Sequence, residues 1–292
     1  MYHYLAQHPD IFMSQRKEPR YFGSDLVLRD GFRITDEADY LALFRDGADA
    51  TYRGEATVFY LYSQKAAEEI HAYSPQAKII IMLREPIGMM LSSHNHYLAS
   101  CNENLTDFEA AYKAQAERLQ GHSVPKDAWY ADALQYKKMV SYTQFIKNYY
   151  EVFGGTQNVH VVLFDDLKQD TAGVYKQVLE FLELDTSFQP KLEAKNPAPP
   201  VSAKVLHRFW IRHPKIRTFL SRIISPQLRR NAMYLLLPLL PKGEGKSTIT
   251  QEFRKELQQQ LAPEVEQLGN LLGRDLSHWC QPADPTEAGD TP

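Results

Sequence analysis

Two apolar runs along the chain have the composition of buried β-strands. KIIIMLR at 78–84 and NVHVVLF at 158–164 are rich in β-branched residues and show no regular polar alternation. Such runs are typical of parallel strands that helices cover on both faces of a sheet. A third run, TVFYLY at 57–62, is a weaker candidate for a strand or for the lead-in to a helix. We therefore expect parallel strands over 78–84 and 158–164.

Elsewhere, apolar residues recur at the spacing of amphipathic helices. This pattern covers five segments, at 63–73, 105–120, 136–154, 171–184 and 250–273. The pair Gly154–Gly155 predicts a helix end, and Pro263 predicts a break in the last helix. Strands that alternate with helices predict an α/β fold with a central, mostly parallel sheet flanked by helices.

Composition and charge exclude several classes of protein. Lys plus Arg number 33 and Asp plus Glu 36, so the formal net charge is −3, which argues against a strongly basic nucleic-acid-binding protein. Two cysteines, Cys101 and Cys280, are too few for a disulfide framework, and they favour a reducing, cytoplasmic setting. No run of 18 apolar residues occurs, so we expect no membrane-spanning segment.

One domain over 1–281 and a disordered, proline-rich tail over 282–292 are the expected organisation. Within the domain, 201–245 differs in character because Lys and Arg are frequent between 204 and 230. We expect a basic helical insertion that forms a lid. Its Lys and Arg side chains form either the solvated face of a helical subdomain or the rim of a site that attracts an anionic substrate.

The segment KIIIMLREPIGMMLSSH at 78–94 carries the clearest chemical signal. A buried strand leads directly into Arg84 and Pro86, and the helix that follows contains Ser92. Ligands bind at the carboxyl ends of parallel strands, where a guanidinium, a hydroxyl and a helix N-terminus together suit a phosphate. The alternative is that Arg84 and Glu85 form an ordinary surface pair.

Strand-Arg-x-Pro-(x)5-Ser resembles the 3′-phosphate-binding motif of sulfotransferases that use 3′-phosphoadenosine 5′-phosphosulfate (PAPS). Further segments resemble the same family, and most of all its bacterial, heparan-sulfate-type branch, in the same order along the chain; they are 2–25, 54–63, 161–185 and 271–279. The resemblance implies a P-loop NTPase-like fold, PAPS as co-substrate, adenosine 3′,5′-bisphosphate (PAP) as product, and no metal.

The resemblance also implies roles for particular residues. Arg84 and Ser92 would bind the 3′-phosphate, and Lys195 and Asn196 would contact the nucleotide from a loop at 188–202, unless that loop is only a proline-rich linker. Glu18 would be the base that takes a proton from a hydroxyl or amine acceptor, with a saccharide as one candidate, and Lys17 would support the transferring group. The alternative is that Lys17, Glu18 and Arg20 are ordinary loop charges. The acceptor's identity and the oligomeric state stay open.

Two histidines of the helix after Arg84 invite a metal assignment. His94 and His96 lie two positions apart, which places them on different sides of a helix, and we expect both to be cleft-wall or surface residues.

The start of the chain departs from the family pattern. The family begins with a strand and a Lys-x-Gly-Thr-Thr loop that cradles the 5′-phosphosulfate, whereas Met1 lies about where the following helix would already be running. We therefore expect the first strand and the phosphate loop to be missing, with an exposed sheet edge beside a helix at 2–8. PKGEGKSTIT at 241–250 does not replace the loop, because Leu240 stands where a Walker-type loop needs glycine. Either an upstream segment is missing from the sequence, or the chain is a non-catalytic relic that binds PAP or another anionic ligand.

Overall fold

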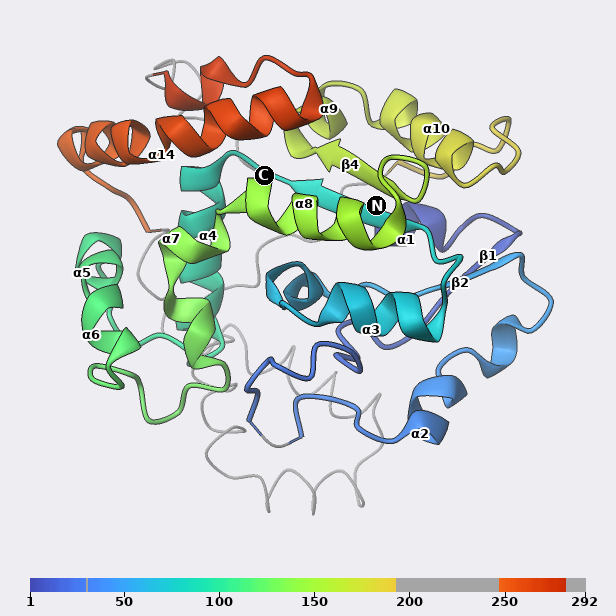
Figure 1. The fold of residues 1–292 in the computed structure, drawn as a ribbon, viewed down its shortest axis with the longest axis horizontal. Coiled ribbons are helices and arrows are strands. Elements are labelled where there is room, and N and C mark those ends of the chain that lie inside the picture. The colour runs from blue at the N-terminus through green and yellow to red at the C-terminus, as the bar shows by residue number, and fades with distance from the viewer. Residues whose placement is uncertain (30, 193–246, 282–292) are drawn as a thin grey trace, which may run out of the picture.

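Strands and helices alternate along the chain in the expected order (Figure 1). The computed structural model describes residues 1–29, 31–192 and 247–281. Its strands are β1 (Ile11–Met13), β2 (Tyr52–Gly54), β3 (Ile79–Leu83) and β4 (Val159–Leu163). The α-helices are α1 (Tyr2–Leu5), α2 (Glu37–Ala42), α3 (Ala66–Tyr73), α4 (Pro86–Ala99), α5 (Phe108–Lys113), α6 (Gln115–Leu119), α7 (Tyr136–Met139), α8 (Tyr142–Phe153), α9 (Phe164–Gln169), α10 (Thr171–Phe181) and α14 (Gln251–Leu272). Short 3₁₀ helices are η1 (Arg45–Gly47), η2 (Val58–Tyr62), η3 (Ala131–Leu134) and η5 (Ser277–Cys280).

The two strongest strand predictions are confirmed. β3 and β4 each begin one residue later and end one residue earlier than predicted, and they pair in parallel from Ile79 opposite Val159 to Leu83 opposite Leu163. Parallel pairing requires a long crossover, and α4 to α8 provide it.

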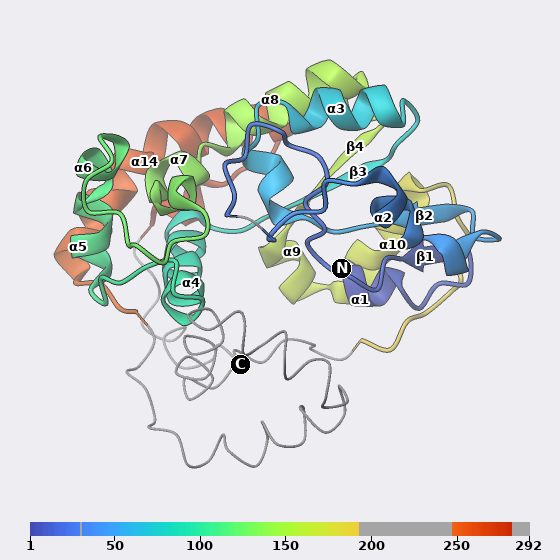
Figure 2. The ribbon, with the colours of Figure 1, turned by 90° about the horizontal axis from the view of Figure 1, so that it is seen from below.

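Helices cover both faces of the β3–β4 pair (Figure 2). Ile81 and Leu83 belong to the same core cluster as Ile146 of α8, whereas Val162 belongs to a second cluster with Val178 of α10. Successive strand residues point to opposite faces, so an apolar run without alternation is what two covered faces require.

The second pair of strands was not predicted. β1 and β2 pair in parallel from Ile11 opposite Tyr52 to Met13 opposite Gly54. With three residues each, these strands are too short to produce a readable pattern. In the described residues the strands therefore form two separate two-stranded sheets. The α/β class with parallel strands flanked by helices is confirmed.

Several predicted boundaries were wrong. The predicted helix at 136–154 is divided into α7 and α8, and the one at 105–120 into α5 and α6. The run at 57–62 forms η2 and buries Phe59 and Tyr62 in the core. α14 continues through Pro263 without the predicted break, because its buried residues, such as Leu261 and Val265, form one continuous core-facing stripe.

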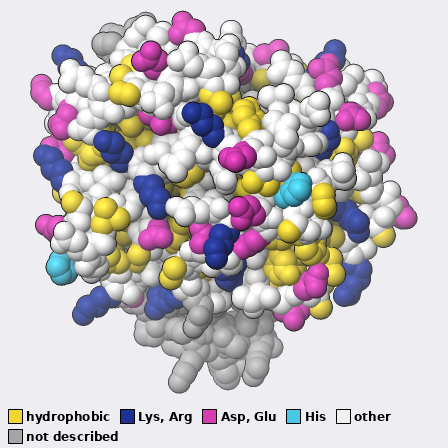
Figure 3. Space-filling view, viewed as in Figure 1, with side chains coloured by type: hydrophobic (Ala, Val, Ile, Leu, Met, Phe, Trp, Pro, Cys, Tyr) yellow, Lys and Arg dark blue, Asp and Glu magenta, His cyan; other side chains and the backbone are white. Residues whose placement is uncertain are grey.

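The charges on the surface and the hydropathy of the helices agree with what the composition of the sequence predicts. On the face seen in Figure 3, acidic and basic side chains are interspersed. Among the described ranges, no helix combines the length and the apolar character that a membrane crossing needs. The basic insertion expected at 201–245 and the tail expected at 282–292 lie outside the described residues.

Candidate functional site

Arg84 lies directly after β3, at the carboxyl end of the strand. Its guanidinium carbon lies 5.5 Å from the centroid of the Phe164 ring, at the carboxyl end of β4. The guanidinium makes no hydrogen bond or ion pair with another residue of the described ranges. It is therefore a half-buried cation that is available to a ligand.

Glu85 and Arg84 form no hydrogen bond or ion pair in the described part of the chain, although the charge of Arg84 lowers the pKa of Glu85 against the larger effect of burial. The Glu85 carboxylate caps α4 by accepting hydrogen bonds from the backbone N–H groups of Ile87, at 2.9 Å, and Gly88, at 2.6 Å. Burial raises the pKa of Glu85, although the two N–H groups oppose that rise. Pro86 occupies the first helical position, where its missing N–H costs nothing.

The absence of a side chain at Gly88 leaves room for the Arg84 guanidinium beside α4. A Cβ atom at Gly88 would lie 3.1 Å from Nε of Arg84 and 3.4 Å from one of its terminal nitrogens. Ser92 is exposed and lies four residues after Gly88, so the two share one face of the helix. The structure thus places Arg84 and Ser92 on the same side of α4, as an anion site would require.

Glu18 lies in the loop that follows β1. Its backbone N–H donates to the carbonyl of Ala56 at 3.0 Å, and its Oε1 accepts from the N–H of Val58 at 3.2 Å. Oε2 is buried and has no hydrogen-bond partner. Burial raises the pKa of Glu18, and the charge of Arg20, the Val58 N–H and the charge of Lys17 oppose this rise in that order.

Lys17 is exposed beside Glu18. Its ammonium nitrogen lies 4.7 Å from the centroid of the Tyr2 ring in α1, a cation–π contact. The Tyr2 hydroxyl in turn donates to the carbonyl of Ser14 at the start of the same loop. The contact with Tyr2 thus places Lys17 over α1. The charge of Lys17 still opposes the rise that burial causes in the pKa of Glu18.

A buried carboxylate fixes the loop that carries Glu18. Glu55 accepts hydrogen bonds from the hydroxyls of Tyr40 at 3.1 Å, Thr57 at 2.7 Å and Tyr60 at 2.9 Å. The Tyr60 hydroxyl also accepts from the backbone N–H groups of Tyr21 and Phe22. Burial raises the pKa of Glu55, and the three hydroxyl groups oppose it.

Two buried tyrosines, Tyr62 and Tyr142, belong to the same core cluster. Burial is the main cause of the raised pKa of Tyr62, and the charge of Glu18 adds to it. The Tyr142 hydroxyl donates to the carbonyl oxygen of Arg84 at 3.0 Å, which fixes the backbone at the end of β3.

His94 is not the cleft-wall or surface residue expected from the sequence. It is fully buried, and its ring nitrogens contact the Ser247 hydroxyl at 2.6 Å and the Leu105 carbonyl at 2.8 Å. Burial lowers its pKa, so it is neutral and connects α4 to the start of α14. His96 is exposed, as expected. In the part of the chain that the structure describes, no three His, Cys, Asp or Glu residues are grouped as metal ligands would be.

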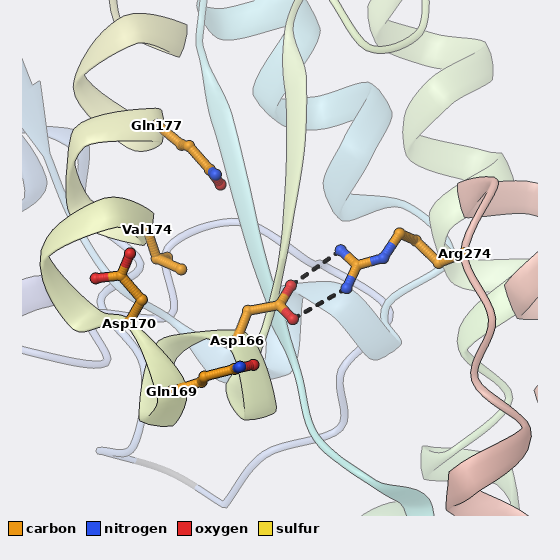
Figure 4. A pocket seen from close by; sticks show the side chains of 6 residues that line it. All are labelled: Asp166, Gln169, Asp170, Val174, Gln177 and Arg274. Atoms are coloured by element: carbon orange, nitrogen blue, oxygen red, sulfur yellow. Dashed lines mark hydrogen bonds and ion pairs between the residues drawn. The ribbon is translucent and has the colours of Figure 1, made fainter.

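The remaining predicted contacts and one further pocket lie apart from this arrangement. Lys195 and Asn196 fall outside the described residues. A shallow polar pocket between α9, α10 and the end of α14 is shown in Figure 4, and its lining consists of Asp166, Gln169, Asp170, Val174, Gln177 and Arg274. Arg274 and Asp166 bind one another through two hydrogen bonds of 3.0 Å. The charge of Arg274 is thereby satisfied, unlike that of Arg84.

Comparison with known proteins shows similarity to sulfotransferases. A family model described as the sulfotransferase domain matches residues 66–201. A crystal structure of a sulfotransferase from Alicyclobacillus acidocaldarius is 26% identical, covers 96% of this chain and 92% of its own, and superimposes with a TM-score of 0.67.

Two curated relatives are carbohydrate sulfotransferases. Carbohydrate sulfotransferase 15 of Mus musculus is 23% identical in an alignment of 275 positions that covers 72% of this chain and 48% of the relative. The protein of the same name from Rattus norvegicus is 28% identical in an alignment of 149 positions that covers 37% of this chain and 26% of the relative. The chain thus spans at most about half the length of these relatives.

Proposed function

We propose that the chain, which is similar to sulfotransferases in its family-model match, its curated relatives and its structural neighbour, transfers a sulfuryl group from PAPS to a hydroxyl or amine group of an acceptor. The observation that carries this proposal is the Arg84 guanidinium at the carboxyl end of β3, which forms no hydrogen bond or ion pair with a described residue, together with Ser92 on the same face of α4. A cation, a hydroxyl donor and a helix N-terminus form a donor set that suits a phosphate dianion.

The residues present fit the nucleotide half of PAPS. Arg84 and Ser92 would hold the 3′-phosphate, and Lys195 and Asn196 remain proposed contacts to the nucleotide. PAPS supplies the sulfuryl group when it is bound. The space that Gly88 leaves beside Arg84 supports this assignment, because a side chain there would displace the guanidinium.

Glu18 is the proposed catalytic base. As the acceptor oxygen or nitrogen forms its bond to sulfur, the bond between sulfur and the phosphate oxygen breaks, and PAP leaves. The acceptor must lose its proton at the same time, and Oε2 of Glu18 has no hydrogen bond that would compete for that proton. Lys17 would support charge on the transferring group.

A saccharide is the proposed acceptor class. The support is that both curated relatives are carbohydrate sulfotransferases. The basic segment between 204 and 230 would suit a saccharide that already carries negative charge.

Calorimetric titration with PAP tests the nucleotide site directly. Arg84→Ala should weaken binding by about 1.5–3 kcal/mol, the worth of a hydrogen bond to a charged group, which is about a 10- to 150-fold rise in Kd. Lys78→Ala is the control, because Lys78 flanks the opposite end of β3 and bonds Glu183. An unchanged Kd for Arg84→Ala would remove Arg84 from the site.

Transfer itself is tested with sulfur-labelled PAPS and a panel of neutral and sulfated saccharides. The proposal expects labelled product with at least one saccharide, and loss of that product for both Arg84→Ala and Glu18→Gln. A chain that binds PAP but labels no saccharide, while labelling a phenol or a simple alcohol, would overturn the acceptor class and keep the reaction.

A further inference from the structure

Arg20 is enclosed by aromatic rings and faces the proposed base. Its Nε lies 3.5 Å from Oε2 of Glu18, and a terminal nitrogen donates to the carbonyl of Phe32 at 3.1 Å. The guanidinium carbon lies 5.0 Å from the centroid of the Trp129 ring and 5.5 Å from that of Phe59. Cation–π contacts of this kind restrict the orientation of a guanidinium more firmly than an exposed position would.

The backbone of this loop adopts a conformation that side-chain-bearing residues rarely accept. Glu18 and Arg20 have φ values of +55° and +54°, in the left-handed region that favours glycine. The surrounding chain maintains the conformation through the Glu18 N–H, which donates to Ala56, and through the carbonyl of Pro19, which accepts from Ile34 at 3.0 Å. Strain that neighbouring segments hold in place is found mostly at functional sites.

The contact between Arg20 and Glu18 differs from a structural ion pair in the same molecule. Arg118 and Glu103 are fully buried and form two hydrogen bonds of 2.7 and 2.8 Å, and the pKa of Glu103 is lowered although burial opposes this. In contrast, Nε of Arg20 and Oε2 of Glu18 are both buried without a hydrogen bond. The pKa of Glu18 is still raised, because the charge of Arg20 only partly offsets burial.

We propose that Arg20 is a positioning residue that acts on the acceptor through Glu18: it keeps the carboxylate ionised and in place without a hydrogen bond to Oε2. This inference rests on the proposed function, because it assumes that Glu18 is the base. A tight bidentate pair would stabilise the carboxylate more, but would occupy the oxygen that the acceptor needs.

Other charged and titratable groups also face this carboxylate. Lys17 comes from the same loop, Glu55 follows β2, Tyr62 belongs to η2, and Tyr97 belongs to α4. Burial raises the pKa of both tyrosines, so they stay neutral when Glu18 titrates. Arg20 is the largest opposing contribution to the raised pKa of Glu18.

The kinetic test compares Arg20→Gln with Arg33→Gln. Arg33 is a matched control, because it lies in the same region, donates to the carbonyls of Tyr21 and Phe22, and also has a buried Nε without a partner, but makes no contact with Glu18. Loss of the Arg20 charge should move the acidic limb of kcat/KM to higher pH, so that activity falls roughly tenfold or more on that limb and recovers at higher pH. Arg33→Gln should leave the position of the limb unchanged.

Arg20→Lys separates charge from packing. Lysine keeps the charge but not the planar guanidinium, so the acidic limb should return toward its wild-type position while kcat stays lowered. If Arg20→Gln reduced activity equally at every pH and Arg20→Lys did not restore the limb, Arg20 would be only a structural residue.

A measurement that does not depend on turnover separates the test of this inference from the test of the proposed function. The titration of Glu18 can be followed by NMR of carboxyl-labelled glutamate, with Glu18→Gln to assign the signal. A higher pKa for Glu18 in Arg20→Gln supports the inference even if no acceptor is sulfated. Detectable transfer with an unchanged Glu18 pKa would overturn the inference and leave the function intact.

Discussion

At the residue scale, Glu18 combines two properties that a base requires. One carboxylate oxygen is held by the Val58 N–H, which fixes the side chain, and the other has no hydrogen bond, which leaves it able to accept a proton. Burial raises the pKa of Glu18 and so makes the ionised carboxylate more basic than an exposed one. The same burial means that ionisation of Glu18 lowers the stability of the fold.

Glu18→Gln removes the base but keeps the shape of the side chain. We expect kcat to fall by roughly 10²- to 10⁴-fold, with the Kd for PAP unchanged because Arg84 and Ser92 remain. In the wild type, activity should be lost as pH falls through the raised pKa of Glu18, above the usual glutamate range. Glu117→Gln, at an exposed carboxylate, is the control. A variant with normal kcat would show that Glu18 is not the base.

The same substitution has a consequence for stability. A folded-state pKa above the unfolded value means that the folded chain loses stability as pH rises through that pKa. Glu18→Gln should therefore have a higher Tm than the wild type at neutral pH, with the difference vanishing below the usual glutamate range. Thermal unfolding at several pH values measures this, and a lower Tm at neutral pH would contradict the sign of the shift.

At the element scale, the N-terminus of α4 is built around the absence of a side chain at Gly88. Glu85 caps the helix at this residue, and Arg84 lies against it. Alanine would favour the helix by about 1 kcal/mol, but its Cβ would lie 2.8 Å from Oε2 of Glu85 and 3.1 Å from Nε of Arg84. The gain in helix propensity therefore affects the free energy of unfolding, whereas the displacement of the guanidinium affects the binding of PAP.

Gly88→Ala should weaken PAP binding, and we expect roughly a tenfold rise in Kd, the worth of one charged hydrogen bond at the lower end. Its free energy of unfolding should change little. Gly173→Ala is a matched control in α10, because Asp170 caps Gly173 in the same way and no arginine lies against it. Equal Kd values for Gly88→Ala and the wild type would show that the position of Arg84 does not depend on Gly88.

The sequence predicts an element well where the residues of that element alone determine its structure. β3 and β4 were predicted within one residue because both faces of each strand are buried. Arg84 and Ser92 could be proposed together because a strand, a proline and one helix connect them. β1 and β2 were missed because their pairing depends on residues about 40 positions apart and leaves no periodic pattern. Arg20 was missed because the left-handed backbone that turns it toward Glu18 is imposed by Ala56 and Ile34.

At the scale of the whole molecule, α8 connects the proposed nucleotide side to the proposed acceptor side. Tyr142, at its start, donates to the carbonyl of Arg84 at 3.0 Å. Tyr149, two turns later, donates to the carbonyl of Tyr60 at 3.0 Å, and Tyr60 holds the loop that follows Glu18. One helix thus contacts both the proposed 3′-phosphate residues and the loop of the proposed base, and it sets the separation that in-line transfer between two bound substrates requires.

This arrangement predicts different effects for the same substitution at two places on one helix. Tyr142→Phe and Tyr149→Phe each keep a buried ring and remove one hydroxyl, so each should lower the free energy of unfolding by about 1–3 kcal/mol, the cost of an unsatisfied buried carbonyl. Only Tyr142→Phe should raise the Kd for PAP, because only Tyr142 holds Arg84. Tyr149→Phe should lower kcat at an unchanged Kd, because it frees Tyr60 and the loop of Glu18. If both variants changed the Kd equally, α8 would act only as part of the core, and the separation of the two substrates would depend on another element.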